Sequence, residues 1–376
     1  MKFTITISLF FIGISYWYSG VSAQNIRSHQ LFNAPRIISN ENSIRNSTEQ
    51  GKDNTVNINL SKEEKSHLTI NKVAARVTSH VSTDGERVAS IFSWIVNHIN
   101  YDQEAFCAGT KSSEDPQKII NSEKAVCTGF SNLFVALCTR NNMDARIITG
   151  YAKGAGNRKG DTFNAPNHAW NSVKIDGKWY LLDISWASAY RMYLNRNKVG
   201  SEKCELPISA YRDFYLAEPE TFVFDHLPED PAWQLLGHPV SLSTFEKGKE
   251  MIQYEINDSS KNLFNFETVI DQTEQLDSLD KNIACLERSI ENQNNQYREY
   301  NLGIAYYYKA GHLMEKAQQM SASALNSTIC QANLFYTKSL SYLTNLEPGA
   351  PDYQFVMLLT DNIKARMQSL ESRVIF

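Results

Sequence analysis

The spacing of apolar residues in the first third of the chain predicts helices. Val73, Val77 and Val81 lie four residues apart, as on one face of a helix. An apolar stripe follows, formed by Val88, Ile91, Phe92, Ile95, Val96 and Ile99. Residues 125–141 are strongly amphipathic, which predicts a further helix with one buried face. Residues 102–123 show no clear period and predict an irregular connection.

Strand patterns replace helical ones after this segment. Residues 145–151 alternate between apolar and polar side chains, as strands with one buried face do. A loop rich in glycine and asparagine covers residues 153–167, and two short apolar segments then flank Asp176 and Gly177. An Asp-Gly pair in this position favours a tight hairpin turn. The mixture of helices and strands predicts an α+β fold.

The chain divides into four predicted parts. Residues 1–23 are typical of a signal peptide, because an apolar stretch follows Lys2 and small residues end it. Residues 24–60 are polar and aperiodic and predict a flexible leader. Residues 61–248 hold the mixed patterns and predict one domain. Residues 249–376 lack strand patterns and predict an all-α domain.

The N-terminal stretch also predicts where the protein resides. It is short for a membrane span and no charged segment stops it. An uncleaved anchor is the alternative. No other apolar run in the chain is long enough to cross a bilayer, so we expect an extracytoplasmic protein, periplasmic or secreted, without stable membrane insertion after cleavage.

Charge and cysteine content exclude several classes of function. The formal net charge is −4, with 21% charged residues and no run of lysine and arginine, so we expect no nucleic-acid partner. The six cysteines are widely spaced, which suits neither a disulfide scaffold nor a zinc site. A bridge between Cys107 and Cys204 is compatible with an oxidising compartment. No acidic cluster indicates calcium, and we expect neither a metal nor a cofactor.

Cys127 is the first residue of a candidate site. It lies where the preceding connection enters a predicted helix, and the helix dipole there stabilises a thiolate, the nucleophilic form of cysteine. A cysteine near a helix start is, by itself, more often a small buried residue. Cys138, three turns further along the same apolar face, fits that alternative and is assigned to the core.

The hairpin supplies the two partners that such a thiol needs. With the turn at Asp176-Gly177, residue 175 pairs with 178 and the register extends to Ala169 opposite Ile184. His168 and Asp183 then project from the same face as diagonal neighbours, within reach of a hydrogen bond. Imidazole can accept the thiol proton, and a carboxylate on its other nitrogen fixes the tautomer. Cys127, His168 and Asp183 are therefore predicted to form a catalytic triad.

Four further residues are predicted around this triad. Trp170 and Trp186 flank the site and should wall it from water, although hairpin packing would also explain them. Gly129 would let a substrate or a facing strand approach the helix closely. Tyr101 is a candidate for the second oxyanion donor beside the Cys127 amide, with core packing as its alternative.

The motifs around these residues resemble those of the transglutaminase-like (papain-like) superfamily, in the same chain order. They are Ala125-Val-Cys-Thr-Gly-Phe-Ser131, Asn167-His-Ala-Trp-Asn171 and Leu182-Asp-Ile-Ser-Trp186. The segment His226-Leu-Pro-Glu-Asp-Pro-Ala-Trp-Gln-Leu-Leu236 is similar to one in the kyphoscoliosis-peptidase branch. The resemblance covers roughly residues 65–240. It implies a papain-like core, in which the nucleophile helix packs on an antiparallel sheet, and acyl transfer at an amide through a thioester.

Three functions are compatible with the sequence. The leading hypothesis is a cysteine peptidase or amidase that acts on peptide or protein substrates. A protein-glutamine transglutaminase or deamidase is the alternative, because the acyl acceptor decides between them. A catalytically silent binding or scaffold module is the third. The C-terminal helices, which loosely resemble a tetratricopeptide unit near Gly303 and Tyr336, are a candidate surface for a protein partner.

Overall fold

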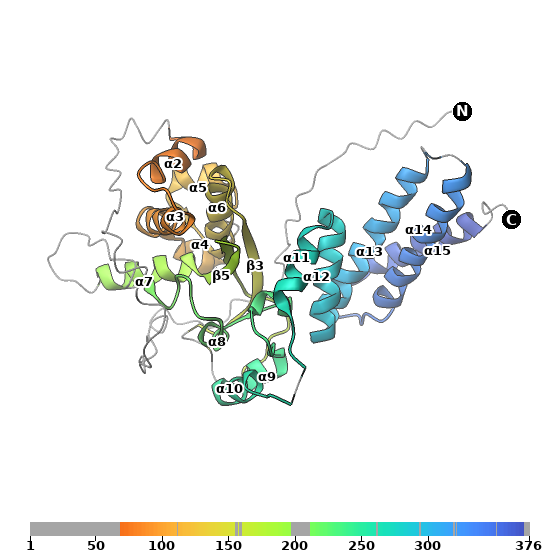
Figure 1. Ribbon diagram of the computed structural model, residues 1–376. Coiled ribbons are helices and arrows are strands. Elements are labelled where there is room, and N and C mark those ends of the chain that lie inside the picture. The colour runs from red at the N-terminus through yellow and green to blue at the C-terminus, as the bar shows by residue number, and fades with distance from the viewer. Residues whose placement is uncertain are drawn as a thin grey trace.

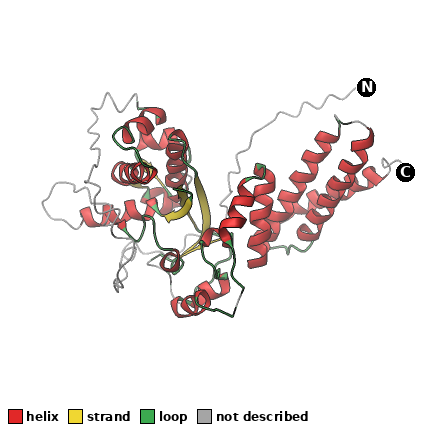
Figure 2. Cartoon of the chain, in the orientation of Figure 1, coloured by secondary structure: helices red, strands yellow, loops and turns green. Residues whose placement is uncertain are grey.

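The computed structural model describes residues 68–371 apart from 111, 155–156, 158–159, 197–210, 261, 293–294, 319, 321 and 351. The predicted signal peptide and leader, Cys204 and part of the loop 153–167 therefore lie outside the described residues. Helices form most of the described chain, and a small sheet lies between two helical groups (Figures 1 and 2). The predicted α+β core followed by an all-α region is confirmed.

Two helices at the start of the described chain match the predicted apolar stripes except at Val81, which lies in the connection between them. Helix α2 covers Ile70–Val77 and α3 covers Asp84–His98. Thr83 and Glu86 form a capping box that fixes the start of α3, because each side chain satisfies a backbone N–H of the first turn. The buried faces of both helices join the main hydrophobic core.

The segment 102–123 is more regular than the sequence pattern indicated. It contains helices α4 (Gln103–Ala108) and α5 (Pro116–Ser122). The prediction of an irregular connection is therefore wrong. Aspartates at 102 and 115 accept hydrogen bonds from first-turn amides of the two helices, so local capping forms helices too short to show a period. Short strands β1 (Asn100–Tyr101) and β2 (Lys124–Ala125) pair in parallel and bracket them.

The main sheet has four antiparallel strands in the order β5-β4-β3-β6. Their bounds are β3 Ala145–Ala152, β4 His168–Ile175, β5 Lys178–Leu182 and β6 His226–Pro228. Helix α6 (Cys127–Arg140) contacts β4 and β3, as the resemblance implied. Strand β4 is buried along nearly its whole length, so both of its faces are covered.

The predicted hairpin register is confirmed up to Leu182, which pairs with Asn171. Beyond that point the prediction is wrong, because the strand does not continue. Helix α7 begins at Ile184 and runs to Arg196, so neither Ile184 nor Ser185 pairs with β4. Asp183 lies between the strand and the helix, and its carboxylate accepts a hydrogen bond from the Trp186 amide at 2.9 Å.

Gly150 in β3 is required for the close approach of β6. A Cβ atom at this position would lie 2.2 Å from the Leu227 carbonyl oxygen and 2.5 Å from the Trp170 ring. Gly150→Ala should therefore displace β6 and lower the free energy of unfolding by about 1–3 kcal/mol, measured by urea denaturation. Gly154→Ala is the matched control, since nothing lies within 4 Å of its Cβ position. Equal stability of the two variants would contradict this account.

After the hairpin, the described residues form helices, connecting loops and one further strand, β6. The helices are α8 (Pro219–Phe222), a 3-10 helix (Pro231–Gln234), α9 (Leu242–Lys247), α10 (Lys249–Ile256), α11 (Phe266–Glu274), α12 (Ser278–Asn292), α13 (Gln296–Ala317), α14 (Ala322–Leu343) and α15 (Tyr353–Glu371). Ile252 of α10 belongs to the same buried hydrophobic cluster as Tyr151 of β3, and Ile270 of α11 belongs to the same cluster as Trp170 of β4. The predicted boundary at 248/249 stays a prediction.

Helices α13 and α14 form a close hairpin. Each has 22 residues, and the Gly303 carbonyl accepts a 2.7 Å hydrogen bond from the Ser339 hydroxyl. A Cβ at Gly303 would lie 2.6 Å from the Leu343 side chain, so the glycine permits this contact. The predicted tetratricopeptide-like repeat stays a prediction. Within the described part of the chain, no helix has the length and apolar character that crossing a membrane requires.

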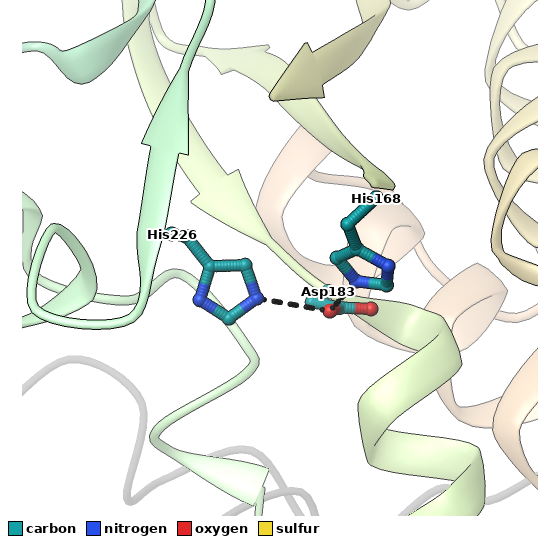
Figure 3. Close-up of side chains that lie close together, drawn as sticks. All are labelled: His168, Asp183 and His226. Carbon is teal, nitrogen blue, oxygen red and sulfur yellow. Dashed lines mark hydrogen bonds and ion pairs between the residues drawn. The ribbon is translucent and has the colours of Figure 1, made fainter. Parts of the chain in front are cut away.

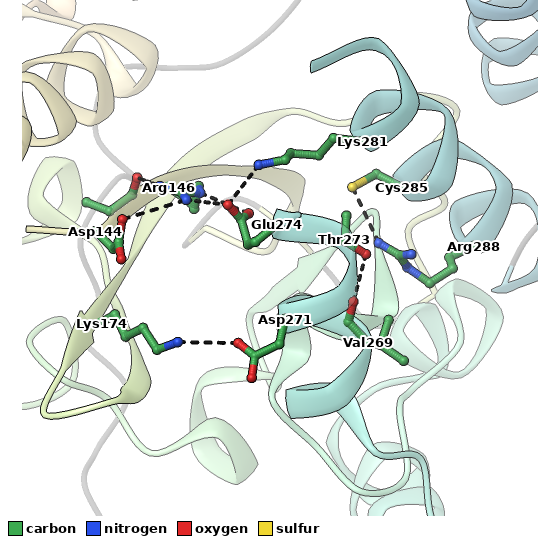
Figure 4. Close-up of polar contacts among 11 residues, drawn as sticks. Asp144, Arg146, Lys174, Val269, Asp271, Thr273, Glu274, Lys281, Cys285 and Arg288 are labelled. Atoms are coloured by element: carbon green, nitrogen blue, oxygen red, sulfur yellow. Dashed lines mark hydrogen bonds and ion pairs between the residues drawn. The ribbon is translucent and has the colours of Figure 1, made fainter. Parts of the chain in front are cut away.

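Ion pairs join the helical region to the sheet (Figure 4). Glu274 at the end of α11 binds the Arg146 guanidinium of β3, and its carboxylate also accepts a 2.8 Å bond from Lys281. On the neighbouring surface, Asp230 makes a two-pronged pair with Arg288 of α12. These contacts hold α11 and α12 against the sheet.

The Glu274 cluster should contribute measurably to stability. Its carboxylate is only 17% exposed, so Glu274→Gln leaves two cations without their partner and should lower the free energy of unfolding by about 1–3 kcal/mol. The matched control is Asp271→Asn, which removes the ion pair between Asp271 and Lys174. The Asp271 side chain is 59% exposed, so we expect the free energy of unfolding to change by less than about 0.5 kcal/mol in this variant. Denaturation curves of the two variants test this, and similar losses would contradict it.

Candidate active site

Cys127 is the first residue of α6, as the sequence predicted. Its N-cap residue, Val126, offers no side-chain hydrogen bond to the helix, so the amides of the first turn are left for another acceptor. The Cys127 side chain is partly exposed. A thiolate at this point would be stabilised by those amides and by the helix dipole.

His168 and Asp183 meet at one end of the sheet. His168 begins β4 and Asp183 follows the last residue of β5, and the His168 Nε2–H donates to Asp183 Oδ2 at 2.7 Å. The Ser185 hydroxyl and the Trp186 amide donate to the other oxygen, at 2.8 and 2.9 Å. Asp183 is wholly buried, so these donors replace the water that its carboxylate has lost.

The two residues shift one another's ionisation. Burial raises the pKa of Asp183, but the charge and hydrogen bond of His168 outweigh it and hold that pKa well below its usual range. Burial lowers the pKa of His168, whereas the Asp183 charge and the hydrogen bonds that His168 makes with Asp183 and Cys127 raise it to about 10. Since Nε2 is bonded to Asp183, Nδ1 is the nitrogen left for the Cys127 thiol. The structure thus brings the three predicted residues together.

This pair should make stability depend on pH. The pKa of His168 is raised from 6.5 to about 10 on folding, so its contribution is complete below pH 6.5 and is lost as pH rises through 10. The Asp183 pKa is lowered from 3.8, so its contribution is lost as pH falls through the folded value. We expect the free energy of unfolding to fall between pH 7 and pH 10, and to fall less in His168→Gln. Parallel pH curves for the two proteins would contradict this assignment.

The comparison with known proteins bears on the same residues. Residues 71–184, which include all three, match the family model of the transglutaminase-like superfamily. The chain is 33% identical over 179 residues to kyphoscoliosis peptidase of Mus musculus, a match that covers 47% of this chain and 26% of that protein. These residues form a transglutaminase-like domain. Its branch is that of kyphoscoliosis peptidase, as the sequence motifs indicated.

Other matches to the transglutaminase-like domain are more distant. Hillarin of Drosophila melanogaster is 25% identical over 197 residues, covering 50% of this chain and 23% of its own. A solved structure of a TGase is 22% identical, covers 39% of this chain and 37% of its own, and has a TM-score of 0.25. The chain spans about a quarter of the length of the curated relatives that it matches.

The four residues predicted around the triad differ in burial and in what they contact. Trp186 is partly exposed and its ring centroid lies 5.3 Å from that of His168, which suits a wall of the site. Trp170 is fully buried and packs at 5.9 Å from the His168 ring, so it supports the imidazole from the core. Gly129 is buried and faces the Ser113 carbonyl and Ile119, at 3.0 and 3.1 Å from its Cβ position. The close approach that we predicted there is made by Ala125 of β2, also at 3.0 Å, and by the residues at the start of α5. The approach of a substrate stays a prediction.

Core packing, one of the two predicted alternatives for Tyr101, is what the structure shows. Its ring stacks on Phe130 of the nucleophile helix with centroids 6.3 Å apart, which is core packing. Burial first, and then the negative charges of Cys127 and Asp183, raise its pKa. The hydroxyl therefore stays protonated at neutral pH and remains a hydrogen-bond donor; its role as the second oxyanion donor stays a prediction.

One residue of the transglutaminase-like domain's site was missed by sequence reasoning. His226, in β6, is buried and its Nε2 lies 3.1 Å from the same Asp183 oxygen that binds His168 (Figure 3). The segment 226–236 was noted for its resemblance, but nothing local connected it with a residue 43 positions earlier. Only the pairing of β6 with β3 brings it there.

His168, Asp183 and His226 are also a set of donors that suits a metal, since one ligand atom from each lies within 4.8 Å of the others. The distance between His168 and Asp183 fits a hydrogen bond better than joint coordination of a metal ion. Nitrogen and oxygen ligands of one tetrahedral zinc ion lie about 3.3 Å apart, whereas His168 Nε2 is 2.7 Å from Asp183 Oδ2, a charge-assisted hydrogen bond.

Proposed function

We propose that this chain is an exported, cysteine-dependent acyl-transfer enzyme that acts on amides of peptides or proteins. The observation that carries the proposal is the buried His168–Asp183 pair, whose free imidazole nitrogen faces Cys127 at the start of α6. The high pKa of His168, about 10, keeps its ring an imidazolium at neutral pH, and a positive charge beside a thiol favours its thiolate form. That ion pair is the reactive form of a cysteine nucleophile.

The residues present can perform each step. The Cys127 thiolate attacks the amide carbonyl, and the oxyanion that forms accepts hydrogen bonds from the Cys127 N–H and the Tyr101 hydroxyl. His168 gives its proton to the leaving nitrogen, which leaves as an amine while a thioester remains on Cys127. His168, now neutral, removes a proton from the incoming water or amine, and the acyl group leaves the sulfur. Asp183 holds the ring in one orientation throughout.

Alkylation by iodoacetamide tests the proposed nucleophile without any knowledge of the substrate. Cys127 should be modified faster than Cys138 and Cys285, because burial raises the pKa of both of those thiols, and the unprotonated form is the one that reacts. His168→Ala should remove the preference. Equal modification of the three cysteines in the wild type would overturn the proposal and favour a non-catalytic binding module.

A peptide library identifies the reaction. Incubation of the full chain with the library, with and without a primary amine, and mass analysis of the products should show cleaved peptides. Amine-linked or deamidated glutamine would instead identify the transglutaminase or deamidase alternative. Products that appear equally with Cys127→Ala would overturn both.

Export is supported by the apolar stretch that ends at Val21-Ser22-Ala23. The protein recovered from outside the cytoplasm should begin at Gln24 when its N-terminus is sequenced. Recovery of a membrane-bound chain that retains Met1 would instead show the uncleaved anchor.

A further inference from the structure

Two histidines share one oxygen of the buried aspartate. His168 Nε2 lies 2.7 Å and His226 Nε2 3.1 Å from Asp183 Oδ2, and Figure 3 shows the two rings approaching this carboxylate from different strands. The second nitrogen of His226, Nδ1, lies 2.6 Å from Asp225 Oδ1. The side chains therefore form a continuous series from His168 to Asp225.

The contacts of His226 determine its protonation. An ionised carboxylate only accepts hydrogen bonds, and a neutral imidazole has a single N–H to donate. Because both ring nitrogens of His226 face carboxylates, both contacts are hydrogen bonds only if the ring is an imidazolium. Burial lowers the pKa of His226, but the Asp225 charge and the hydrogen bonds to both aspartates raise it above its ordinary value.

The surroundings of His226 suit a buried cation. Its ring stacks on Phe222 of α8 with centroids 4.0 Å apart and an interplanar angle of 11°, and Trp186 and Trp170 lie at 4.4 and 5.2 Å. Aromatic faces attract cations. None of these three rings carries a charge, so the ionisable groups that face His226 are Asp225 beside it, Asp183 before α7 and His168 of β4.

We propose that His226 is a positioning residue of the active site, an imidazolium held by Asp225 that fixes the Asp183 carboxylate for His168 and adds a permanent positive charge beside the triad. This inference rests on the proposed function, since it describes how that site is tuned. His226 acts through Asp183, because its two ring nitrogens contact the two aspartates.

The added charge has a definite direction of effect. A cation near the site favours the thiolate of Cys127 and disfavours a proton on His168. It therefore moves the ionisation of both groups to lower pH. Asp225 is the part of the series that reaches solvent, with 40% of its side chain exposed. The positive charge of the buried His226 is therefore stabilised by a carboxylate at the protein surface.

The test is the pH dependence of Cys127 alkylation by iodoacetamide in the full chain. His226→Gln replaces the ring by a neutral amide that can still donate to Asp183, so the midpoint pH should rise by about one unit. Asp225→Asn, at a partly exposed position, should move it in the same direction by less. His238→Gln is the control, because this histidine is half-buried and is not part of the series from His168 to Asp225.

The outcomes separate this inference from the proposed function. An unmoved midpoint in both His226→Gln and Asp225→Asn, with preserved His168-dependent alkylation, would overturn the role of His226 alone. If His226 were purely structural, His226→Gln would lower thermal stability and leave the midpoint pH unchanged. If His226→Gln does not fold, the midpoint of Asp225→Asn decides. Alkylation that does not depend on His168 in the wild type would defeat the proposed function instead.

Discussion

Cys127→Ala is expected to reduce turnover to the uncatalysed background, a loss of about 10⁶-fold for a residue that acts as the nucleophile of a triad. Folding should be unaffected. The side chain is partly exposed at the first turn of α6, and alanine is the best helix former, so the free energy of unfolding should change by less than about 0.5 kcal/mol. Turnover of a cleaved library peptide and a urea denaturation curve give the two measurements.

Cys138→Ala is the matched control on the same helix. Its thiol is fully buried in the main core, so its removal leaves a small cavity and should cost about 1 kcal/mol of stability. Turnover should be retained. If the two variants behaved alike, either in activity or in stability, the assignment of one cysteine to chemistry and the other to packing would fail.

Asp183→Asn is expected to reduce turnover by about 10⁴-fold. The carboxylate accepts four hydrogen bonds, from His168, His226, the Ser185 hydroxyl and the Trp186 amide. An amide has one accepting oxygen, so its NH₂ group must face N–H or O–H donors on one side. If it faces His168, the imidazole is driven to the tautomer that cannot accept the Cys127 proton. Steady-state kinetics on the library peptide measures the loss.

Ser185→Ala separates orientation from charge in the same group. It removes one of the donors to Asp183 Oδ1 and leaves the carboxylate and its contact with His168 in place, so turnover should fall by about tenfold or less, the equivalent of one hydrogen bond. A fully active Asp183→Asn would require that another group orient His168, and the triad would then lose its third member.

Local sequence features determined much of the structure. The stripes before residue 99 and the segment 125–141 formed helices because their apolar residues share a face, a property that spacing alone establishes. The Asp176-Gly177 turn set the hairpin register, since both residues adopt the positive φ that a two-residue hairpin turn requires, 48° and 82°. Helices α4 and α5 were missed because they depend on caps and have too few residues to display a period.

The tertiary structure decided how the site is completed. Hairpin register placed Asp183 near His168, yet their hydrogen bond forms because β5 ends at Leu182 and the chain turns into α7. His226 reaches Asp183 because β6 pairs with β3, so that His226 lies opposite Ala152 and His168 opposite Gly150. Side chains two residues apart on a strand share a face, and the two partners of β3 therefore present their histidines on the same side of the sheet. Spacing along the chain indicates which residues share one helix or hairpin. The strand that adds the second histidine is distant in sequence, so its position depends on long-range strand pairing. That pairing is selected by the packing of the whole core.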